Sequence, residues 1–234
     1  MAVNRTVETV YNTLAPVEQN DLEFVIHGDS DTHIDLDIKL YVRGKLGSCS
    51  GQDVDVTDTT AVVNNLLHSL FSQCTIMVNG VPVTQSHEHY NYRAYLETLL
   101  TYGTEAAALH LSNFYWYLDN GHMQPNDLKA ETHTSATNDG FIVRRNRQSG
   151  SRDVQLLELL HTNLCNVPIF LLTRLPLQIK LTKARPSFYL MKKVLIRKPL
   201  SNFWTLICLS DACSLTLKFM RLKKGAGKRR PRTV

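Results

Sequence analysis

Hydrophobic and polar residues alternate along much of this chain with the period of short β-strands. In the clearest case, residues 33–46, the aliphatic face consists of Ile34, Leu36, Ile38, Leu40 and Val42. The residues between them are polar or charged, and a period of two over ten residues predicts a strand with one buried face. Shorter apolar runs predict further strands at residues 24–26, 54–56, 154–160 and 177–181, the last being the expected final strand.

The remaining segments predict loops between these strands. Residues 110–140 are polar apart from one aromatic cluster, and residues 144–150 (RRNRQSG) predict an exposed basic loop. The run 154–160 is apolar on both faces, which predicts a strand buried inside a sandwich. Many short strands, long loops and regular turn signals indicate an all-β fold, an antiparallel β-sandwich with short helices inserted in its loops.

Residues 62–102 interrupt the strand pattern with two helical segments and a hairpin. The first segment has apolar residues at the spacing of one helical face, namely Leu66, Leu67, Leu70 and Phe71. An apolar run at residues 74–78 then ends in Asn79-Gly80. Because both residues tolerate positive φ, this pair predicts a tight β-hairpin.

The second helical segment carries the candidate interface residues, Tyr92, Arg93 and Tyr95. Its apolar stripe ends before Gly103, a typical helix C-cap, and consists of Tyr92, Tyr95, Leu96, Leu99 and Leu100. Aromatic residues favour partly wet contacts, so the tyrosines are candidates for an interface. The spacing of Tyr90, Tyr92 and Tyr95 on a helix favours instead their packing against the sandwich, with Arg93 as a surface ion-pair partner.

Two stretches of the chain resemble a family of viral capsid proteins. The pattern NxLLHSLFSQxxIxVNG at residues 64–80, followed by YxYRAYLETLLTY at 90–102, resembles the first jelly roll of major capsid proteins from Maverick/Polinton-type elements and adintoviruses. Residues 159–191 resemble the end of that jelly roll. Together the stretches cover about a third of the chain, in the family's order.

The resemblance selects the jelly roll among antiparallel sandwiches. It implies a double jelly roll that self-associates into trimeric, pseudo-hexagonal capsomers, with loops forming the contacts between subunits. We divide the chain into an N-terminal arm, a jelly-roll domain and a basic C-terminal segment, at residues 1–23, 24–191 and 192–234.

The family pattern continues into a second jelly roll after residue 191, whereas the composition of this chain changes there. This departure predicts a truncated or frame-shifted copy whose last segment, from about residue 192, is not family sequence. A chain with one jelly roll is expected to expose an apolar face that would associate with a partner.

Charge is distributed unevenly. Residues 1–191 carry 14 Lys and Arg against 20 Asp and Glu, whereas residues 192–234 carry 12 Lys and Arg against one Asp. The basic end contains the candidate nucleic-acid-binding residues Lys223, Lys224, Lys228, Arg229, Arg230 and Arg232. Such a segment binds phosphates non-specifically, serves as a nuclear-import signal, or does neither.

The N-terminus, the lengths of the apolar runs and the cysteines indicate the cellular compartment of the protein. The N-terminus lacks the apolar core of a signal peptide, and no run reaches the roughly 18 apolar residues of a membrane helix. The chain has five cysteines at irregular spacing, which favours an intracellular protein with reduced thiols. We expect an intracellular or nuclear protein without a membrane partner, which enters a virion if it assembles.

The sequence offers weak candidates for a metal or phosphate site, and we predict no catalytic residue, metal or cofactor. His87 and His89 have the i, i+2 spacing of a cupin ligand pair, but the next carboxylate is Glu97. A pair at Cys208 and Cys213 lacks the second pair that zinc needs. The segment 225–228 (GAGK) lacks the earlier glycine and the Ser or Thr of a phosphate-binding loop.

Three functions remain open from the sequence. The first is a structural capsid protein, or an endogenous remnant of one. The second is a cellular β-sandwich binding module whose basic tail contacts nucleic acid. The third, which the residues favour least, is a metal enzyme of the cupin type.

Overall fold

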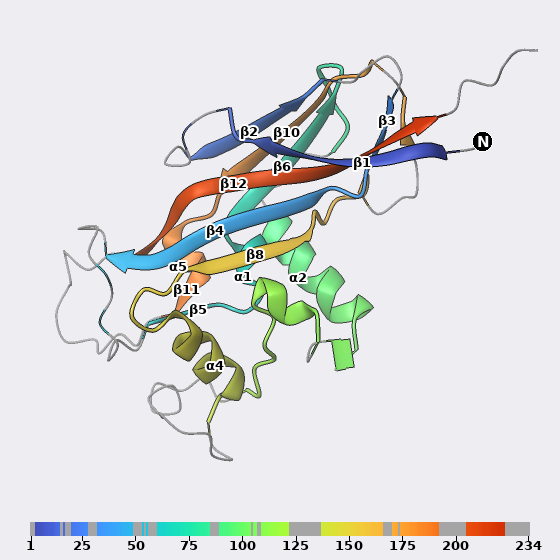
Figure 1. Cartoon of the computed structure of the whole chain (residues 1–234). Helices are drawn as coiled ribbons and strands as arrows, with labels where there is room; N and C mark the ends of the chain where they lie inside the picture. Colours follow the sequence, from blue (N-terminus) through green and yellow to red (C-terminus); the bar gives the residue numbers. More distant parts are fainter. Residues whose placement is uncertain are drawn as a thin grey trace, which may run out of the picture.

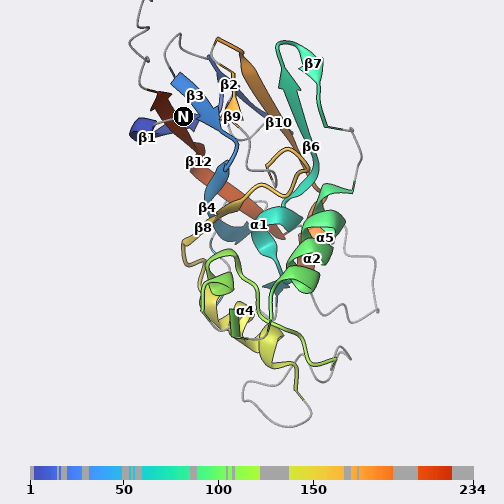
Figure 2. The same cartoon turned by 90° about the vertical axis from the view of Figure 1, so that its right-hand side faces the viewer.

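The structure is a computed structural model of the 234-residue chain. It describes residues 3–14, 16, 20–27, 32–48, 53, 55, 60–84, 89–103, 105–106, 109–121, 137–165, 170–172, 174–191 and 205–222. Two antiparallel sheets face each other, and short helices gather at one end of the sandwich (Figures 1 and 2).

The larger sheet follows the order β8-β4-β12-β3-β9, with β1 paired to β12. Its strands are β1 (Val3–Asn12), β3 (Thr32–Asp35), β4 (Lys39–Ser48), β8 (Val154–Leu159), β9 (Phe170–Leu171) and β12 (Thr205–Leu222). The smaller sheet has the order β2-β10-β6-β7. Its strands are β2 (Asp21–Ile26), β6 (Phe71–Val78), β7 (Val81–Pro82) and β10 (Leu177–Lys183). A separate ladder joins β5 (Ala61–Val62) to β11 (Leu190–Met191).

Strand β12 connects most of the larger sheet. Along one side its backbone pairs with β4 over residues 205–216 and with β3 over residues 219–221. Its other side pairs with β1 over residues 214–222. The chain therefore continues in strands after β10, and the expectation that residues 177–181 form the final strand is wrong.

The core lies between the two sheets and is built from alternate aliphatic side chains. The predicted face of residues 34–42 is confirmed, since all five aliphatic residues are buried. The predicted single strand is divided into β3 and β4, because residues 36–38 leave the ladder. There the Ile38 N–H donates to the Leu36 carbonyl (2.8 Å). The smaller sheet contributes Leu22, Phe24, Ile26, Ile76, Leu177, Ile179 and Leu181.

The predicted hairpin is confirmed between β6 and β7. Asn79 and Gly80 have φ values of 51° and 76°, so both central residues are left-handed. This is the type I′ geometry that suits the right-handed twist of paired strands, and glycine adopts it without a Cβ penalty.

Five helices are described, and all of them lie at one end of the sandwich, which we call the helical end. They are α1 (Leu66–Ser69), α2 (Tyr90–Thr101), the 3₁₀ helix η1 (Leu111–Phe114), α4 (Asp139–Gln148) and α5 (Pro186–Tyr189). The first predicted helical segment is confirmed as α1, although Phe71 already begins β6. Helix η1 lies within the predicted long loop.

Helix α4 corrects the prediction of an exposed basic loop at residues 144–150. The side-chain oxygen of Asn138 accepts a hydrogen bond from the Phe141 N–H (3.0 Å) and so caps the helix. Asp139 in the first turn complements the positive end of the helix dipole. At Gly140 the helix touches the backbone of residues 117–118, where a Cβ would clash with the Leu118 carbonyl.

Arg144 anchors α4 to the rest of the fold. Its side chain is fully buried, and its guanidinium donates to the carbonyls of Val62 (3.0 Å) and Tyr117 (2.7 Å). It also forms an ion pair with the Asp119 carboxylate (2.7 Å). One cation thus satisfies acceptors on β5 and on the segment after η1, which explains why it is tolerated in the interior.

Strand β8 is less buried than its sequence predicts. Val154 and Leu156 face the core, whereas Gln155 and Leu157 are exposed. β8 ends the path of the larger sheet, next to β4, so it has one wet face. The prediction of a strand buried on both faces is therefore wrong.

Replacing Arg144 tests the anchor of α4. We expect Arg144→Met to lower the free energy of unfolding by about 3 kcal/mol, because one buried and two partly buried acceptors lose a charged donor. Urea unfolding followed by circular dichroism measures the change. Arg152→Met, at an exposed position, is the control and is expected to change stability by less than about 0.5 kcal/mol. Equal stability of the two variants would contradict the anchor.

Candidate functional site

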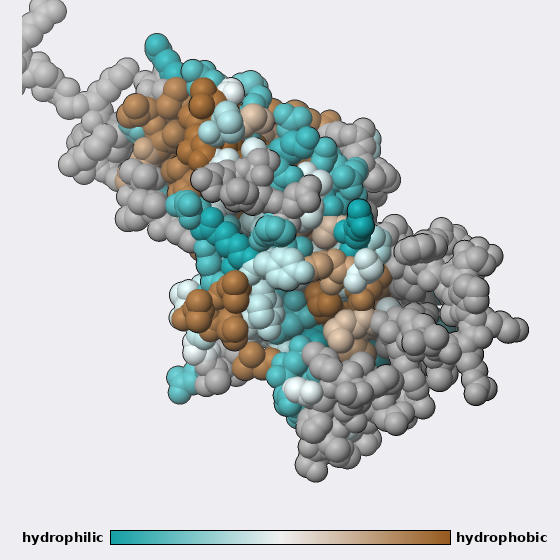
Figure 3. Space-filling view, turned by 180° about the vertical axis from the view of Figure 1, so that it is seen from behind, coloured by the Kyte–Doolittle hydropathy of each residue, from teal (hydrophilic) through white to brown (hydrophobic). Residues whose placement is uncertain are grey.

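Helix α2 buries a face of mixed polarity and turns most of its large apolar side chains outward. Its buried residues are Tyr90, Asn91, Ala94 and Thr98. We call the outward residues the α2 stripe, with exposed fractions of 56% for Tyr92, 36% for Tyr95, 53% for Leu96, 45% for Leu99 and 83% for Leu100. Brown side chains gather at this place at the lower left of Figure 3. The helix prediction is confirmed. Of the three tyrosines expected to pack against the sandwich, Tyr90 is buried, whereas Tyr92 and Tyr95 are exposed.

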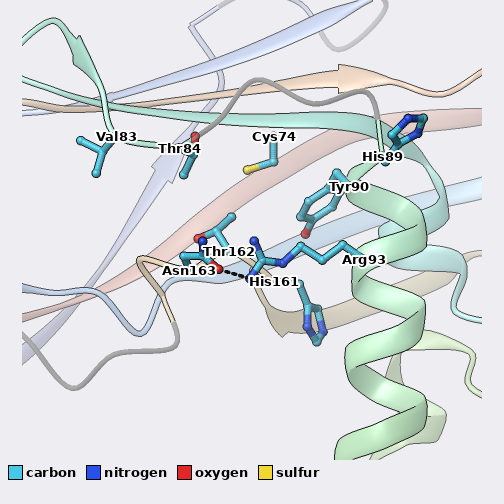
Figure 4. Close-up of a pocket in the computed structure, with 9 residues that line it drawn as sticks. All are labelled: Cys74, Val83, Thr84, His89, Tyr90, Arg93, His161, Thr162 and Asn163. Atoms are coloured by element: carbon cyan, nitrogen blue, oxygen red, sulfur yellow. Dashed lines mark hydrogen bonds between the residues drawn. The ribbon is translucent and has the colours of Figure 1, made fainter.

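The three candidate interface residues occupy two different faces. The Tyr92 ring lies 5.3 Å from the Phe188 ring and the Tyr95 ring lies 5.0 Å from the Trp116 ring, between centroids, so each tyrosine is held along one edge. Arg93 instead points toward the sandwich and the turn after β8 (Figure 4). An interface role for these residues stays a prediction.

A cavity of about 610 Å³ opens where the first turn of α2 meets β6 and the turn after β8 (Figure 4). Its lining residues are Cys74, Val83, Thr84, His89, Tyr90, Arg93, His161, Thr162 and Asn163. The volume is in the range of small-molecule sites, and both polar and apolar groups line it.

A chain of charged hydrogen bonds closes one wall of this cavity. Arg93 donates to Glu97 Oε1 (2.7 Å) and to Asn163 Oδ1 (2.6 Å). The other Glu97 oxygen accepts from His161 Nδ1 (2.8 Å), which fixes the tautomer of that imidazole. Burial acts to raise the pKa of Glu97, but the hydrogen bonds from His161 and Arg93 outweigh it and lower that pKa. The carboxylate therefore stays ionised and ties α2 to the turn.

A second imidazole lies behind this chain. His68 of α1 is fully buried, with its Nδ1 2.9 Å from the Tyr90 hydroxyl and its ring 4.6 Å from the His161 ring. Burial, with a smaller effect of His161, lowers the pKa of His68 well below its usual range. Burial also lowers the pKa of His161, against the opposing effect of Glu97. Both rings are neutral near pH 7, so they pack as polar core residues.

The two buried thiols near the cavity both have raised pKa values. Burial raises the pKa of the Cys74 thiol well above its usual range, and it raises that of Cys165 to about 11. A nucleophilic cysteine needs the opposite shift, because the thiolate is the reactive form. The hydrogen bonds of the two imidazoles hold α1, α2 and the turn after β8 together, whereas burial opposes ionisation of the thiols.

Other candidate sites have mixed outcomes. His89 precedes α2 and is exposed, whereas His87 lies outside the described residues. Within the described residues, no three His, Cys, Asp or Glu side chains are grouped to hold a metal ion. No helix in the described part of the chain is long and apolar enough to span a membrane. The basic residues of segment 223–232 lie outside the described residues.

The sequence does not single out the residues that hold this site together. Neither His68 nor His161 has the spacing of a metal-ligand pair, yet their rings meet at the centre of the helical end. Asn64 was also missed: its side-chain oxygen accepts from the Tyr117 N–H (2.7 Å) and so ties the start of α1 to the segment after η1. The one available signal was the polar His68 inside an otherwise apolar helical face.

Comparison by sequence gives no match, either to a protein-family model or to a curated protein. Comparison of folds does give matches. A chain of the Sputnik virophage structure determined by cryo-EM matches with a TM-score of 0.59 at 12% identity, over 96% of this chain and 49% of that chain. The mavirus major capsid protein also matches, with a TM-score of 0.45 at 13% identity, over 92% of this chain and 46% of that chain. The PBCV-1 virus capsid matches with a TM-score of 0.46 at 11% identity, over 95% of this chain and 44% of that chain.

These findings define the fold class. The protein is an antiparallel β-sandwich of the jelly-roll type with short helices in its loops, which confirms the predicted class. The chain spans about half the length of the solved chains that it matches. At this identity the likeness establishes the fold alone.

Acid should destabilise the protein through its buried imidazoles. Because the folded pKa of His68 lies below the unfolded value of about 6.5, the unfolded chain binds more protons below that pH. The stabilisation is therefore complete above pH 6.5 and is lost as the pH falls. We expect urea unfolding to give about 1.4 kcal/mol less stability at pH 5.5 than at pH 7.5 from His68 alone.

The variant His68→Leu isolates this effect. It should remove most of that difference between the two pH values, whatever its own effect on stability at neutral pH. His27→Gln, at an exposed position, should leave the difference unchanged. If His68→Leu retained the full pH dependence, the assignment to this buried imidazole would be wrong.

Proposed function

We propose that this protein is a structural protein of a viral capsid shell, or an endogenous remnant of one. The observation that carries the proposal is the fold match with the virophage chain, which extends over 96% of this chain. The helical end agrees with it, since its buried imidazoles connect α1, α2 and the turn after β8, and its thiols lack the lowered pKa of reactive groups. Under this proposal the protein is not an enzyme.

The finer part of the proposal is the lineage, the double jelly-roll capsid proteins of Maverick/Polinton-type elements and adintoviruses. The sequence resemblance covers residues 64–80, 90–102 and 159–191. In space these three segments supply α1, β6 with the Asn79-Gly80 turn, α2, the turn after β8 and β10. Strand β6 pairs with β10, and residues of β6, α2 and the turn after β8 line the cavity, so these parts of the resembling stretches are contiguous in the fold. This contiguity supports a family relationship over chance similarity of separate segments.

The proposed mechanism is assembly. One sandwich buries its edges and loops against neighbouring copies in a closed symmetric array, and the resemblance implies a trimer. The chain offers a short edge at β7, which ends the smaller sheet and has two residues. Short edges limit open-ended strand pairing, which would otherwise lead to aggregation.

The oligomeric state of the purified full-length chain tests the proposal. Size-exclusion chromatography with light scattering, over a dilution series, should give a mass three times that of the 26.6 kDa monomer, or a multiple of the trimer. A monodisperse monomer at every concentration would contradict a shell protein. A monomer that binds nucleic acid would instead favour the cellular binding module.

The basic C-terminal residues belong to the same proposal as contacts to an enclosed nucleic acid. Lys and Arg side chains release counterions from phosphates, so the contact would be independent of sequence and sensitive to salt. The negative balance of residues 1–191 leaves this segment as the main positive charge of the chain. Under the proposal the protein is made in the cell, enters the nucleus if the segment acts as an import signal, and ends in the virion.

Neutralising the basic segment tests this contact. A variant with Gln at all six positions (Lys223, Lys224, Lys228, Arg229, Arg230 and Arg232) should lose binding to a random-sequence DNA duplex. Its remaining binding should show a flatter salt dependence, by about 0.9 in the log–log slope for each lost phosphate contact. Arg152→Gln with Arg174→Gln, both at exposed positions, is the control. Unchanged binding of the six-site variant would dismiss the role of the segment.

A further inference from the structure

Helix α2 is oriented against the usual rule for a helix on a protein surface. Such a helix normally buries its apolar face and exposes its polar face. The buried face of α2 combines Tyr90 and Ala94 with the polar Asn91 and Thr98. Most of its large apolar side chains form the α2 stripe, which faces outward, and Leu100 is 83% exposed. An apolar stripe at regular helical spacing on the outer surface indicates an interaction site.

The orientation is fixed by contacts on the inner face. Arg93 and Glu97 are linked to each other and to Asn163 and His161 of the turn after β8. The Tyr90 hydroxyl meets His68 of α1. Rolling the helix to bury its leucines would break these charged and buried hydrogen bonds, each of which is costly to lose. The outward direction of the stripe is therefore a built feature of the fold.

The stripe is large enough to be the centre of a stable contact. Its five side chains expose on the order of 500 Å² together, if a fully exposed side chain of this size presents roughly 200 Å². One partner in a standard protein interface contributes about 800 Å², so the stripe supplies more than half of that area. Its Tyr and Leu composition matches the apolar, charge-depleted core of an interface.

The charges of α2 indicate what covers the stripe. The helix has two charged residues, Arg93 and Glu97, and both are engaged with the turn after β8. The stripe therefore lacks the cations that attract nucleic acid or anchor an interfacial helix on lipid headgroups. A contact with an identical chain brings no like charges together at this surface.

We propose that the α2 stripe is covered by a second copy of this chain in the assembled protein. This inference rests on the proposed function and deepens it, because it names the surface through which copies associate. Leu96 and Leu100 lie one helical turn apart on the stripe and become buried in the contact. Tyr92 and Tyr95, braced by Phe188 and Trp116, border them as rigid aromatic contacts.

The double variant Leu96→Glu/Leu100→Glu of the full-length chain tests the assignment. Both side chains are at least half exposed, so the fold should persist, with unchanged circular dichroism and urea midpoint. Sedimentation equilibrium should show a dissociation constant raised by about 100-fold or more, because the contact loses two apolar side chains and would have to bury two new charges. The neutral variant Leu96→Gln/Leu100→Gln should weaken association in the same direction.

The control is Leu157→Glu/Leu172→Glu, two leucines of similar exposure outside α2, which should retain the wild-type dissociation constant. Association of both stripe variants at the wild-type level would overturn the assignment, as would equal weakening by the control. If the wild type associates and the stripe variants do so equally, only this inference fails. If the wild type is a monomer throughout, the proposed function fails with it.

Binding of wild-type protein to phosphatidylcholine vesicles, lost in the stripe variants while copies still associate, would assign the stripe to a lipid surface and overturn the proposal.

Discussion

Burial of alternate aliphatic side chains between two facing sheets is the interaction on which the rest of this structure depends. The face from Ile34 to Val42 meets the inward residues of β2, β6 and β10, all of them buried. Because side chains alternate along a strand, a slip of one residue would turn every one of these groups into solvent. This constraint sets the register of the sheets, and the register determines where the connections, and with them the helices, emerge.

The helical end follows different physics from the sandwich. Its centre contains Arg144, His68, His161 and Glu97, which are polar groups held by specific acceptors and donors. Such groups are costly to bury and are tolerated where their partners are in place, so they favour one arrangement over others. This network fixes the rotation of α2 about its own axis and thereby places its leucines on the outer surface. An apolar contact alone would have favoured the opposite rotation.

The sequence predicts well those structural features that depend on residues close together along the chain. The buried face of residues 34–42 and the turn at Asn79-Gly80 follow from a period of two and from tolerance of positive φ. The helical nature of α2 was also predictable, but its orientation was not, because His161 and Asn163 lie some 70 residues away along the chain. Helix α4 was missed since Asn138-Asp139-Gly140 resembles a turn and the acceptors of Arg144 are distant in sequence. The cavity brings together residues from 74 to 163 and left no local signature.

Under the proposed function, the protein needs a stable unit and a surface that stays uncovered until neighbouring copies bind. The sandwich provides the first, and the outward apolar stripe of α2 is suited to provide the second. Cryo-EM of the purified full-length protein tests this account most directly, because it reads the fold and the contacts together. The account predicts an oligomer of jelly-roll subunits with the α2 stripe buried between copies. Single-copy particles, or an oligomer in which the stripe faces solvent on every subunit, would contradict it.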